Sequence, residues 1–126
     1  MLQDLCVGLI GGSGLGEALT RTTRGTTEAI DTPFGPPSAP IVRAEWGGVP
    51  IAFLARHGPW HTPPPSAVPI GRTSAPKRAG CTHIIASGAT GSLQEEVRPG
   101  ELVVPDQLID RTHRRAGSFF DEPGLA

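Results

Sequence analysis

An arginine and a histidine follow each other directly at the end of an apolar run. The run is Ile51–Ala55, and Arg56, His57 and Gly58 come next. A short apolar run bounded by turn residues is typical of a buried strand, and ligands bind at the carboxyl ends of strands in open α/β sheets. A guanidinium matches a tetrahedral oxyanion bidentately, and a neighbouring imidazole adds a further donor. The pair therefore predicts an anion site, with a plain surface Arg-His pair as the alternative.

Two glycine-containing turns follow other predicted strands. The strand at 6–10 leads into 11–16, where Ser13 stands among four glycines, and the strand at 82–87 leads into the segment 88–92. Glycine permits positive φ and lets backbone N–H groups approach an anion closely. If the three strands are adjacent, their tips are expected to form one phosphate or sulfate site.

The elements that must position these tips are predicted as short strands between turns. Residues 41–46 and 49–55, joined by Gly47-Gly48, are expected to form a β-hairpin with a two-residue turn. The first arm should expose Arg43 and Glu45 on a solvated face, and the apolar second arm should lie deeper. Further along, Ser92 with Glu95 fits a capping box for a short helix, and 101–105 and 107–110 are expected as strand or strand-loop segments.

The composition limits the classes of function. The 126 residues make about one domain, with 11 Lys plus Arg against 12 Asp plus Glu, so neither a nucleic-acid nor a membrane partner is indicated. Glycine (17) and proline (14) punctuate apolar segments, which favours loops around strands over disorder. The N-terminus lacks a signal-peptide pattern, so a cytoplasmic location is expected. Cys6 and Cys81 have no metal-ligand spacing, so we expect buried free thiols and no metal.

A strand followed by a glycine loop also raises a dinucleotide-binding oxidoreductase domain as an alternative. The glycines at 11, 12, 14 and 16 do not fit the G-x-G-x-x-G frame. Asp31 could serve as the ribose-binding acid, but that acid should end a second parallel strand. Here it is followed by the turn-rich stretch 32–37.

Five ordered blocks resemble the 5′-methylthioadenosine phosphorylase branch of the trimeric purine nucleoside phosphorylases, over essentially the whole chain. The blocks are residues 9–15, 31–35, 55–58, 91–93 and 106–112. The resemblance implies an α/β/α sandwich around a mixed sheet, as in the phosphorylase/hydrolase-like folds. It also implies that residues 1–126 are the N-terminal portion of a single nucleoside phosphorylase domain, since the family enzymes are much longer.

The same resemblance implies phosphorolysis of a purine nucleoside, in which phosphate attacks C1′ and yields the free base and a ribose 1-phosphate. The substrate class is 5′-methylthioadenosine, methylthioinosine or another purine nucleoside; inorganic phosphate is the co-substrate and no cofactor is implied. The family's phosphate-binding positions fall on Ser13, Arg56, His57, Gly88 and Ala89, and positions lining the base and sugar pocket fall on Thr90 and Gly91. No catalytic acid or base is assigned, because the family's base-contacting region has no counterpart in this stretch.

Three departures from the family pattern qualify this expectation. First, the chain corresponds to part of the family fold, so an inactive truncated remnant is the alternative to an enzyme. Exposed apolar sheet faces also disfavour the family's homotrimer for this stretch alone. Second, Gly88 stands where the family usually has a hydroxyl residue. Third, residues 70–76 can be read as the family's helical segment one base out of frame, a compensated frameshift hypothesis, and Gly71 and Pro76 would weaken a helix there.

Overall fold

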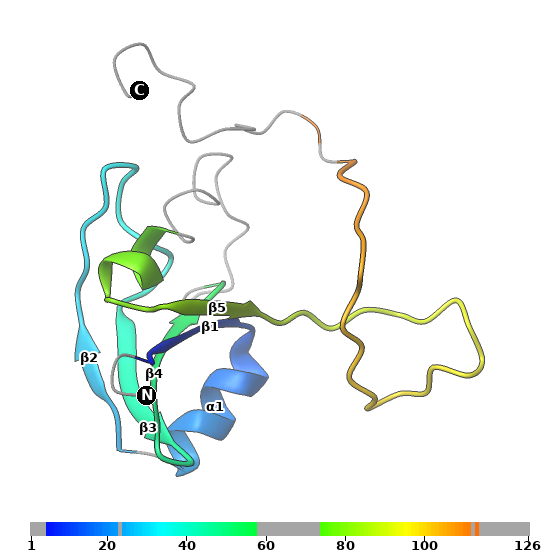
Figure 1. The fold of residues 1–126 in the computed structure, drawn as a ribbon, viewed down its shortest axis with the longest axis horizontal. Helices are drawn as coiled ribbons and strands as arrows, with labels where there is room; N and C mark the ends of the chain where they lie inside the picture. The colour runs from blue at the N-terminus through cyan, green and yellow to red at the C-terminus, as the bar shows by residue number, and fades with distance from the viewer. Residues whose placement is uncertain (1–4, 23, 58–73, 112, 114–126) are drawn as a thin grey trace.

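A five-stranded mixed sheet forms the centre of the fold (Figure 1). This computed structural model describes residues 5–22, 24–57, 74–111 and 113. The strands are β1 (Val7–Gly11), β2 (Thr26–Glu28), β3 (Ile41–Trp46), β4 (Val49–Ala55) and β5 (His83–Ala86). One longer helix, α1 (Ser13–Thr22), follows β1, and a short helical segment occupies 74–78.

The strand order in the sheet is β2-β3-β4-β1-β5. The strands β4, β1 and β5 run parallel, with Gly11 opposite Ala55 and Ile10 opposite Ala86. The strands β2, β3 and β4 are antiparallel. The expected mixed α/β sheet is confirmed, and the three strands predicted to carry functional tips are neighbours.

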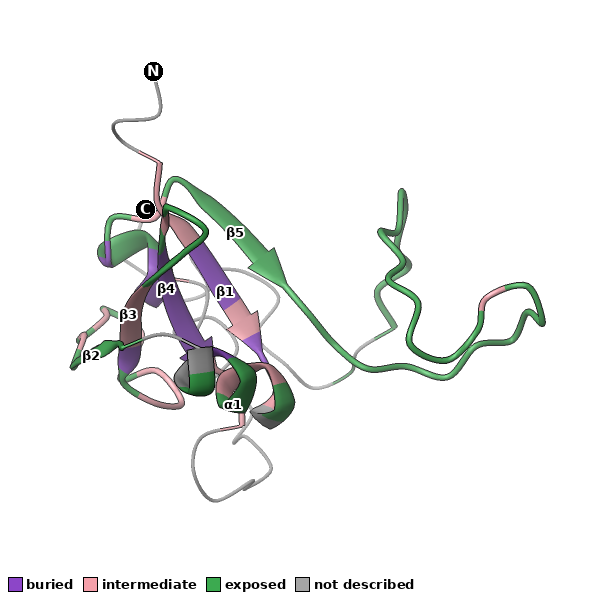
Figure 2. Ribbon diagram, turned by 90° about the horizontal axis from the view of Figure 1, so that it is seen from below, coloured by how far each residue is buried: buried purple, intermediate pink, exposed green. Residues whose placement is uncertain are grey.

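The strand β4 is buried on both faces, so it forms the middle of the core (Figure 2). Because side chains alternate across a strand, its residues divide between two clusters. Ile51 and Phe53 pack on the side of α1, with Leu9 and Leu19. On the other side lies a second cluster, which contains the short helical segment: Ala52, Leu54, Ile41, Ala75 and Ala79. Helical residues therefore cover both faces of the sheet at this strand.

The predicted hairpin is confirmed, and the strands β1 and β5 differ from the expected residue ranges only at their ends. Gly47 (φ 59°) and Gly48 (φ 80°) both have positive φ, as a type I′ turn requires. The strand expected at 6–10 runs from 7 to 11, and the one expected at 82–87 is confined to 83–86. The face of β3 expected to be solvated is partly covered, because Arg43 donates to the carbonyl of Ala79 at 2.8 Å and pairs with Glu28.

The glycine turn expected at 11–16 is wrong. Gly11 ends β1, and Gly14 and Gly16 lie inside α1; the described glycines with positive φ are elsewhere, Gly47 and Gly48 among them. The glycines at 11 and 16 instead allow close packing. A Cβ on Gly11 would lie 2.7 Å from Leu15 Cδ2, and one on Gly16 would lie 2.9 Å from Phe53 Cε1.

The expectations for the C-terminal segment are also wrong. Residues 93–96 form bends and turns, and the Ser92 hydroxyl accepts a hydrogen bond from the amide of Gln94 at 3.0 Å instead of capping a helix. The stretch 101–110 has no strand. The strand β5 exists, but all four of its residues are exposed, against the expectation of a buried strand. It lies at the edge of the sheet, and Figure 2 shows it and the segment that follows it in the colour of exposed residues.

The segment 74–78 is helical although it contains Pro76. The helix starts at 74, so the proline falls in the first turn, where its missing N–H is not needed. The other end is closed by Gly80, with φ 81°, whose amide donates to Lys77 O at 3.0 Å while the amide of Cys81 donates to Pro76 O at 3.0 Å. These two bonds define a Schellman motif. Residues 70–73, the start of the stretch with the frameshift hypothesis, lie outside the described residues.

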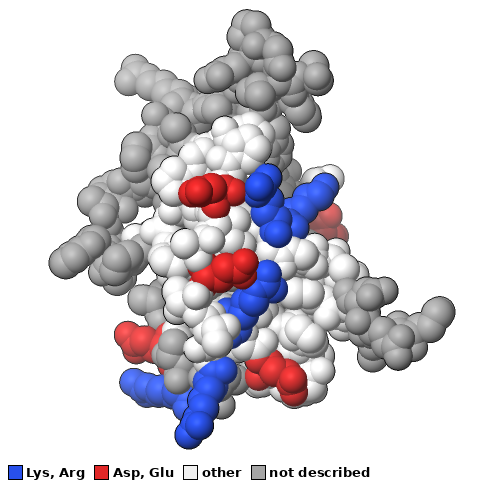
Figure 3. Space-filling model, turned by 90° about the vertical axis from the view of Figure 1, so that its left-hand side faces the viewer, with Lys and Arg blue, Asp and Glu red and all other residues white. Residues whose placement is uncertain are grey.

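Acidic and basic side chains alternate over the face shown in Figure 3. This interspersion agrees with the near-neutral net charge of −1. Within the described part of the chain, no helix combines the length and apolar character needed to cross a membrane.

Two glycines of α1 provide a matched test of this packing. Gly14→Ala and Gly16→Ala share the same gain in helix propensity, roughly 0.5–1 kcal/mol. The new methyl meets nothing within 4 Å at position 14, whereas at position 16 it meets the ring of Phe53, which is 5% exposed. We expect Gly16→Ala to be less stable than Gly14→Ala by about 1–3 kcal/mol in urea denaturation. Equal stabilities would contradict the contact between α1 and β4.

Candidate functional site

The carboxyl ends of three neighbouring parallel strands meet at one edge of the sheet. β1 lies in the middle, and the residues that follow each strand are Gly12, Arg56 and Ser87. Two backbone bonds continue the pairing past the strand ends: Arg56 N donates to Gly11 O at 2.8 Å, and Ser87 N donates to Ile10 O at 2.8 Å. The three tips are therefore held together by the backbone of β1 on both sides.

The guanidinium of Arg56 reaches from the tip of β4 to the tip of β5. Its Nη1 donates to the carbonyl of Ser87 at 3.2 Å, and its Nε donates to Nε2 of His57 at 3.3 Å. Nε2 of His57 is the acceptor in this arrangement, so Nδ1 is the ring nitrogen that can donate. Arg56 and His57 are both half-buried, so the pair is accessible at the sheet edge.

Gly88 lies against this guanidinium. A Cβ at position 88 would stand 3.2 Å from Nη1 of Arg56 and 3.9 Å from Nη2. A Cβ at this position would require the end of Arg56 to move by only a few tenths of an ångström. The structure thus brings Gly88 to the Arg56-His57 pair, which the sequence placed at the end of a different predicted strand.

None of the contacts described above involves the other four predicted site residues, which are Ser13, Ala89, Thr90 and Gly91. Ser13 opens α1 directly after β1, but its side chain lies outside what the structure describes. Ala89, Thr90 and Gly91 are exposed on the segment that leaves the sheet after β5 (Figure 1). The hydroxyl of Thr90 donates to the carbonyl of Gly91 at 3.4 Å, a local contact, and a Cβ on Gly91 would meet nothing within 4 Å. No described contact joins Thr90 or Gly91 to Arg56.

Two hydroxyl residues near the tips were missed by the sequence reasoning. The hydroxyl of Ser38 donates to Ala55 O at 2.7 Å and so supports the end of β4 beside Arg56. The hydroxyl oxygen of Ser87 lies 3.2 Å from the position that a Cβ on Gly11 would occupy. The only signal for Ser87 was its place at the end of a predicted strand. Ser38 lies in a proline-rich loop and gave no signal at all.

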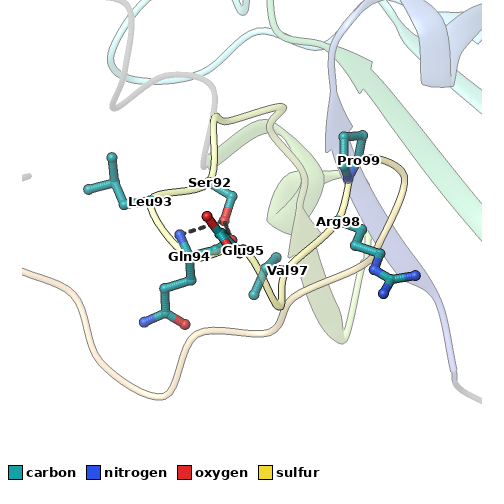
Figure 4. Close-up of a pocket in the computed structure, with 7 residues that line it drawn as sticks. All are labelled: Ser92, Leu93, Gln94, Glu95, Val97, Arg98 and Pro99. Atoms are coloured by element: carbon teal, nitrogen blue, oxygen red, sulfur yellow. Dashed lines mark hydrogen bonds between the residues drawn. The ribbon is translucent and has the colours of Figure 1, made fainter.

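A shallow hollow of about 480 Å³ lies elsewhere, within the segment after β5 (Figure 4). Its lining is Ser92, Leu93, Gln94, Glu95, Val97, Arg98 and Pro99. None of these is one of the predicted phosphate-binding residues, and almost all are exposed. The hollow is the inside of a loop, so we base no chemistry on it.

The described residues can also be compared with two alternative kinds of site, a metal site and a dinucleotide-binding site. They contain no cluster of three or more His, Cys, Asp or Glu side chains suited to a metal ion. Asp31 follows β2, which is antiparallel to β3, and does not end a parallel strand. The geometry that a dinucleotide-binding fold requires of the ribose-binding acid is therefore not found at Asp31.

These features define an α/β protein in which the guanidinium of Arg56, here called the cationic fork, lies at the carboxyl ends of parallel strands. The family model described as the phosphorylase superfamily matches residues 7–125, and the chain belongs to this superfamily.

Two named relatives are similar to nearly the whole of this chain. The chain is 46% identical over 122 residues to S-methyl-5'-thioadenosine phosphorylase of Aedes aegypti, covering 96% of this chain and 43% of that protein. It is 46% identical over 119 residues to the protein of the same name from Synechocystis, covering 92% of this chain and 36% of that protein. The chain thus spans about two fifths of the length of these curated relatives.

Solved structures agree with the sequence comparison. Methylthioadenosine phosphorylase from Schistosoma mansoni in complex with adenine superposes with a TM-score of 0.80 at 40% identity, over 95% of this chain and 43% of that one. A methylthioadenosine phosphorylase from an antarctic soil metagenomic library gives a TM-score of 0.79 at 42% identity, over 93% of this chain and 41% of that one. The fold of this chain is therefore part of the phosphorylase fold, as the five sequence blocks implied.

Proposed function

We propose that this chain provides the phosphate-binding part of a purine nucleoside phosphorylase. The nucleoside is 5′-methylthioadenosine, methylthioinosine or another purine nucleoside, and the second substrate is inorganic phosphate. The observation that carries the proposal is the guanidinium of Arg56, which spans the tips of the parallel strands with His57 and Gly88 beside it. The relatives named S-methyl-5'-thioadenosine phosphorylase support the substrate class.

Each predicted residue has a role in this proposal that suits its chemistry. Arg56 binds the phosphate dianion through two N–H groups, and His57 donates from its ring. The backbone amides of Gly88 and Ala89 are further donors, and Ser13 opens α1, where a helix N-terminus favours an anion. Thr90 and Gly91 follow as part of the sugar and base pocket.

The phosphate serves as both nucleophile and electrostatic partner. Departure of the purine leaves positive charge on the sugar, as in glycoside hydrolysis, and a dianion held below C1′ stabilises that charge while attacking it. Arg56 orients the dianion and takes part in no proton transfer, because a guanidinium stays protonated. In this proposal the group that assists departure of the base comes from the part of the family fold that this chain does not span.

The rest of the proposed enzyme must cover surfaces that the described residues leave exposed. In β5, Ile84 is 42% exposed and Ile85 is 57% exposed, and Leu102 further on is 99% exposed. Parallel strands are normally buried on both faces. We therefore include in the proposal a complete phosphorylase domain that covers these residues. The proposed assembly is the family's homotrimer, and the proposed location is the cytoplasm.

The same exposed residues favour the second candidate, an inactive remnant. A chain that leaves Ile84, Ile85 and Leu102 in water has an incomplete core, and such surfaces promote aggregation. The remnant has no catalysis, whether or not its strand tips still hold phosphate weakly.

A chimera separates the two candidates. This chain replaces the matching stretch of the Aedes aegypti relative, and release of adenine from 5′-methylthioadenosine is followed with and without phosphate. We expect phosphate-dependent release by the chimera and none by the 126-residue chain alone. A chimera that folds, as judged by circular dichroism and a cooperative melt, yet releases no adenine would establish the remnant instead.

Replacing the cationic fork tests the role of Arg56 in this chimera. Arg56→Lys keeps the charge but loses the bidentate geometry, and a hydrogen bond to a charged group contributes roughly 1.5–3 kcal/mol. We expect the KM for phosphate to rise about 10- to 100-fold. The control is Arg21→Lys, because the Arg21 side chain is 81% exposed and pairs with Glu17 only at 3.9 Å. If both variants behave alike, Arg56 does not bind the phosphate.

Restoring the family's hydroxyl at position 88 should improve phosphate binding. Gly88→Ser adds a donor beside Arg56, and the added Cβ, 3.2 Å from Nη1, requires only a small shift of a flexible side-chain end. We expect the KM for phosphate to fall by up to about tenfold, the worth of one hydrogen bond of about 1.4 kcal/mol. Gly88→Ala carries the same Cβ without the hydroxyl, so an equal improvement in that variant would refute the hydrogen bond.

A further inference from the structure

The two cysteines lie side by side although they are 75 positions apart in the sequence. Their sulfur atoms are 3.6 Å apart, and both are half-buried free thiols. Cys6 immediately precedes β1, and Cys81 comes shortly before β5, the parallel neighbour of β1. The pair therefore stands at the amino ends of the two strands whose carboxyl ends form the candidate site.

The backbone around Cys6 is fixed to the start of β5 by one threonine. The amide of Thr82 donates to Cys6 O at 2.8 Å. The hydroxyl of Thr82 accepts from the amide of Cys6 at 3.2 Å and donates to its carbonyl at 3.1 Å. These bonds hold the backbone of Cys6 next to the residue that follows Cys81.

Cys81 is held from the other direction by the end of the 74–78 helix. Its amide closes the Schellman motif by donating to Pro76 O at 3.0 Å. Gly8 leaves room for its thiol, since a Cβ on Gly8 would lie 3.3 Å from Cys81 Sγ and 2.8 Å from Pro76 Cβ. Both thiols therefore point into one small space between β1 and this helix, packed against the core cluster of Ala75 and Ala79.

This geometry is close to that of a disulfide. A disulfide bond is about 2.05 Å long and joins residues whose Cα atoms lie roughly 4.4–6.8 Å apart. The hydrogen-bonded neighbour of Cys6 is Thr82, so Cys81 is one residue away from the position directly opposite Cys6, and the 3.6 Å between the two sulfurs shows that the side chains already meet. Rotation about the side-chain bonds can bring the sulfurs together while the strands stay in register.

We propose that Cys6 and Cys81 form a thiol–disulfide exchange site, which takes a small-molecule disulfide as oxidant and closes an intramolecular bond between the starts of β1 and β5. This site is independent of the proposed phosphate binding. It lies at the opposite ends of the strands from Arg56, so its closure leaves the tips of the strands free.

The reaction proceeds by two exchanges. The thiolate of Cys6 attacks one sulfur of the oxidant, forms a mixed disulfide and releases one thiolate of the reagent. Cys81 then loses its proton to solvent, and its sulfur attacks the sulfur of Cys6 and displaces the second reagent thiolate. Two protein thiols lose two electrons and two protons, and the oxidant is reduced to two thiols.

The order of attack follows from the surroundings of Cys81. Burial and, after it, the hydrogen bond with Cys6 raise the pKa of Cys81 to about 12, and the charge of Arg43 only partly opposes this rise. Cys81 is therefore a protonated thiol at neutral pH and reacts second. The dithiol is the resting state, and closure requires an added oxidant.

The test is oxidation of the whole 126-residue chain with oxidised glutathione. We expect a monomer that has lost two hydrogens by intact mass under non-reducing conditions, with both cysteines protected from alkylation. Closing a loop of this length should raise the midpoint of thermal unfolding by roughly 10 °C or more, and dithiothreitol should reverse the rise.

Single replacements are the matched controls. Cys6→Ser and Cys81→Ser each leave one thiol, so each can gain at most one glutathione and should show no rise in the unfolding midpoint. The proposal is overturned if the unaltered chain gives only glutathione adducts or disulfide-linked dimers. It is also overturned if the closed form melts below the reduced one, because the bond would then not fit the native strands.

Discussion

The position of β1 between β4 and β5 is the constraint on which the rest of the structure depends. Its backbone accepts hydrogen bonds from residues on both sides beyond the regular pairing, from Arg56 through Gly11 and from Ser87 through Ile10. Parallel strands place their carboxyl ends at one edge, so this register alone decides that residues from distant parts of the chain meet there. At the amino end, the same register brings Cys6 next to the start of β5.

Close approach between the elements is made possible by glycines. Gly11 allows Leu15 to pack on the end of β1, and Gly16 allows α1 to lie on Phe53, because in both cases the neighbour occupies the space that a Cβ would need. Gly88 lies beside the end of Arg56 with slightly more room, since a Cβ there would stand 3.2 Å from Nη1. The glycines therefore set how tightly the helix, the strand tips and the guanidinium can assemble, and backbone freedom is not what they contribute at these positions.

The difference between local sequence signals and packing contacts explains which parts of the structure were predictable from the sequence. The hairpin was predictable because Gly47-Gly48 is a local signal, and the ends of β1, β4 and β5 were predictable because short apolar runs end in Arg56-His57 and in glycines. The helix α1 was not predictable, since Gly14 and Gly16 argue against a helix locally and the contact with Phe53 is invisible in the sequence. The patterns at 92–95 and 101–110 failed for a related reason, because a capping pair or an apolar run forms an element only when something packs on it. The ordered motif blocks identified the family because they depend on residue identity and order, which local packing does not change.

The exposure of the strand tips bears on how strongly the fork can hold an anion. Arg56 already donates to Ser87 O and to His57, so its geometry is set in advance and binding costs little additional ordering. Its surroundings are nevertheless half open to solvent. Two unit charges 4 Å apart interact by about 1 kcal/mol in water but by about 4 kcal/mol at an effective dielectric constant of about 20. Covering this edge with the remainder of a phosphorylase domain would thus strengthen contacts that the chain already makes, in addition to supplying groups for the purine. Under the proposed function, the described residues form an ordered but weak phosphate site by themselves. Exclusion of water, more than any rearrangement of Arg56, would then allow the proposed site to hold a reacting dianion.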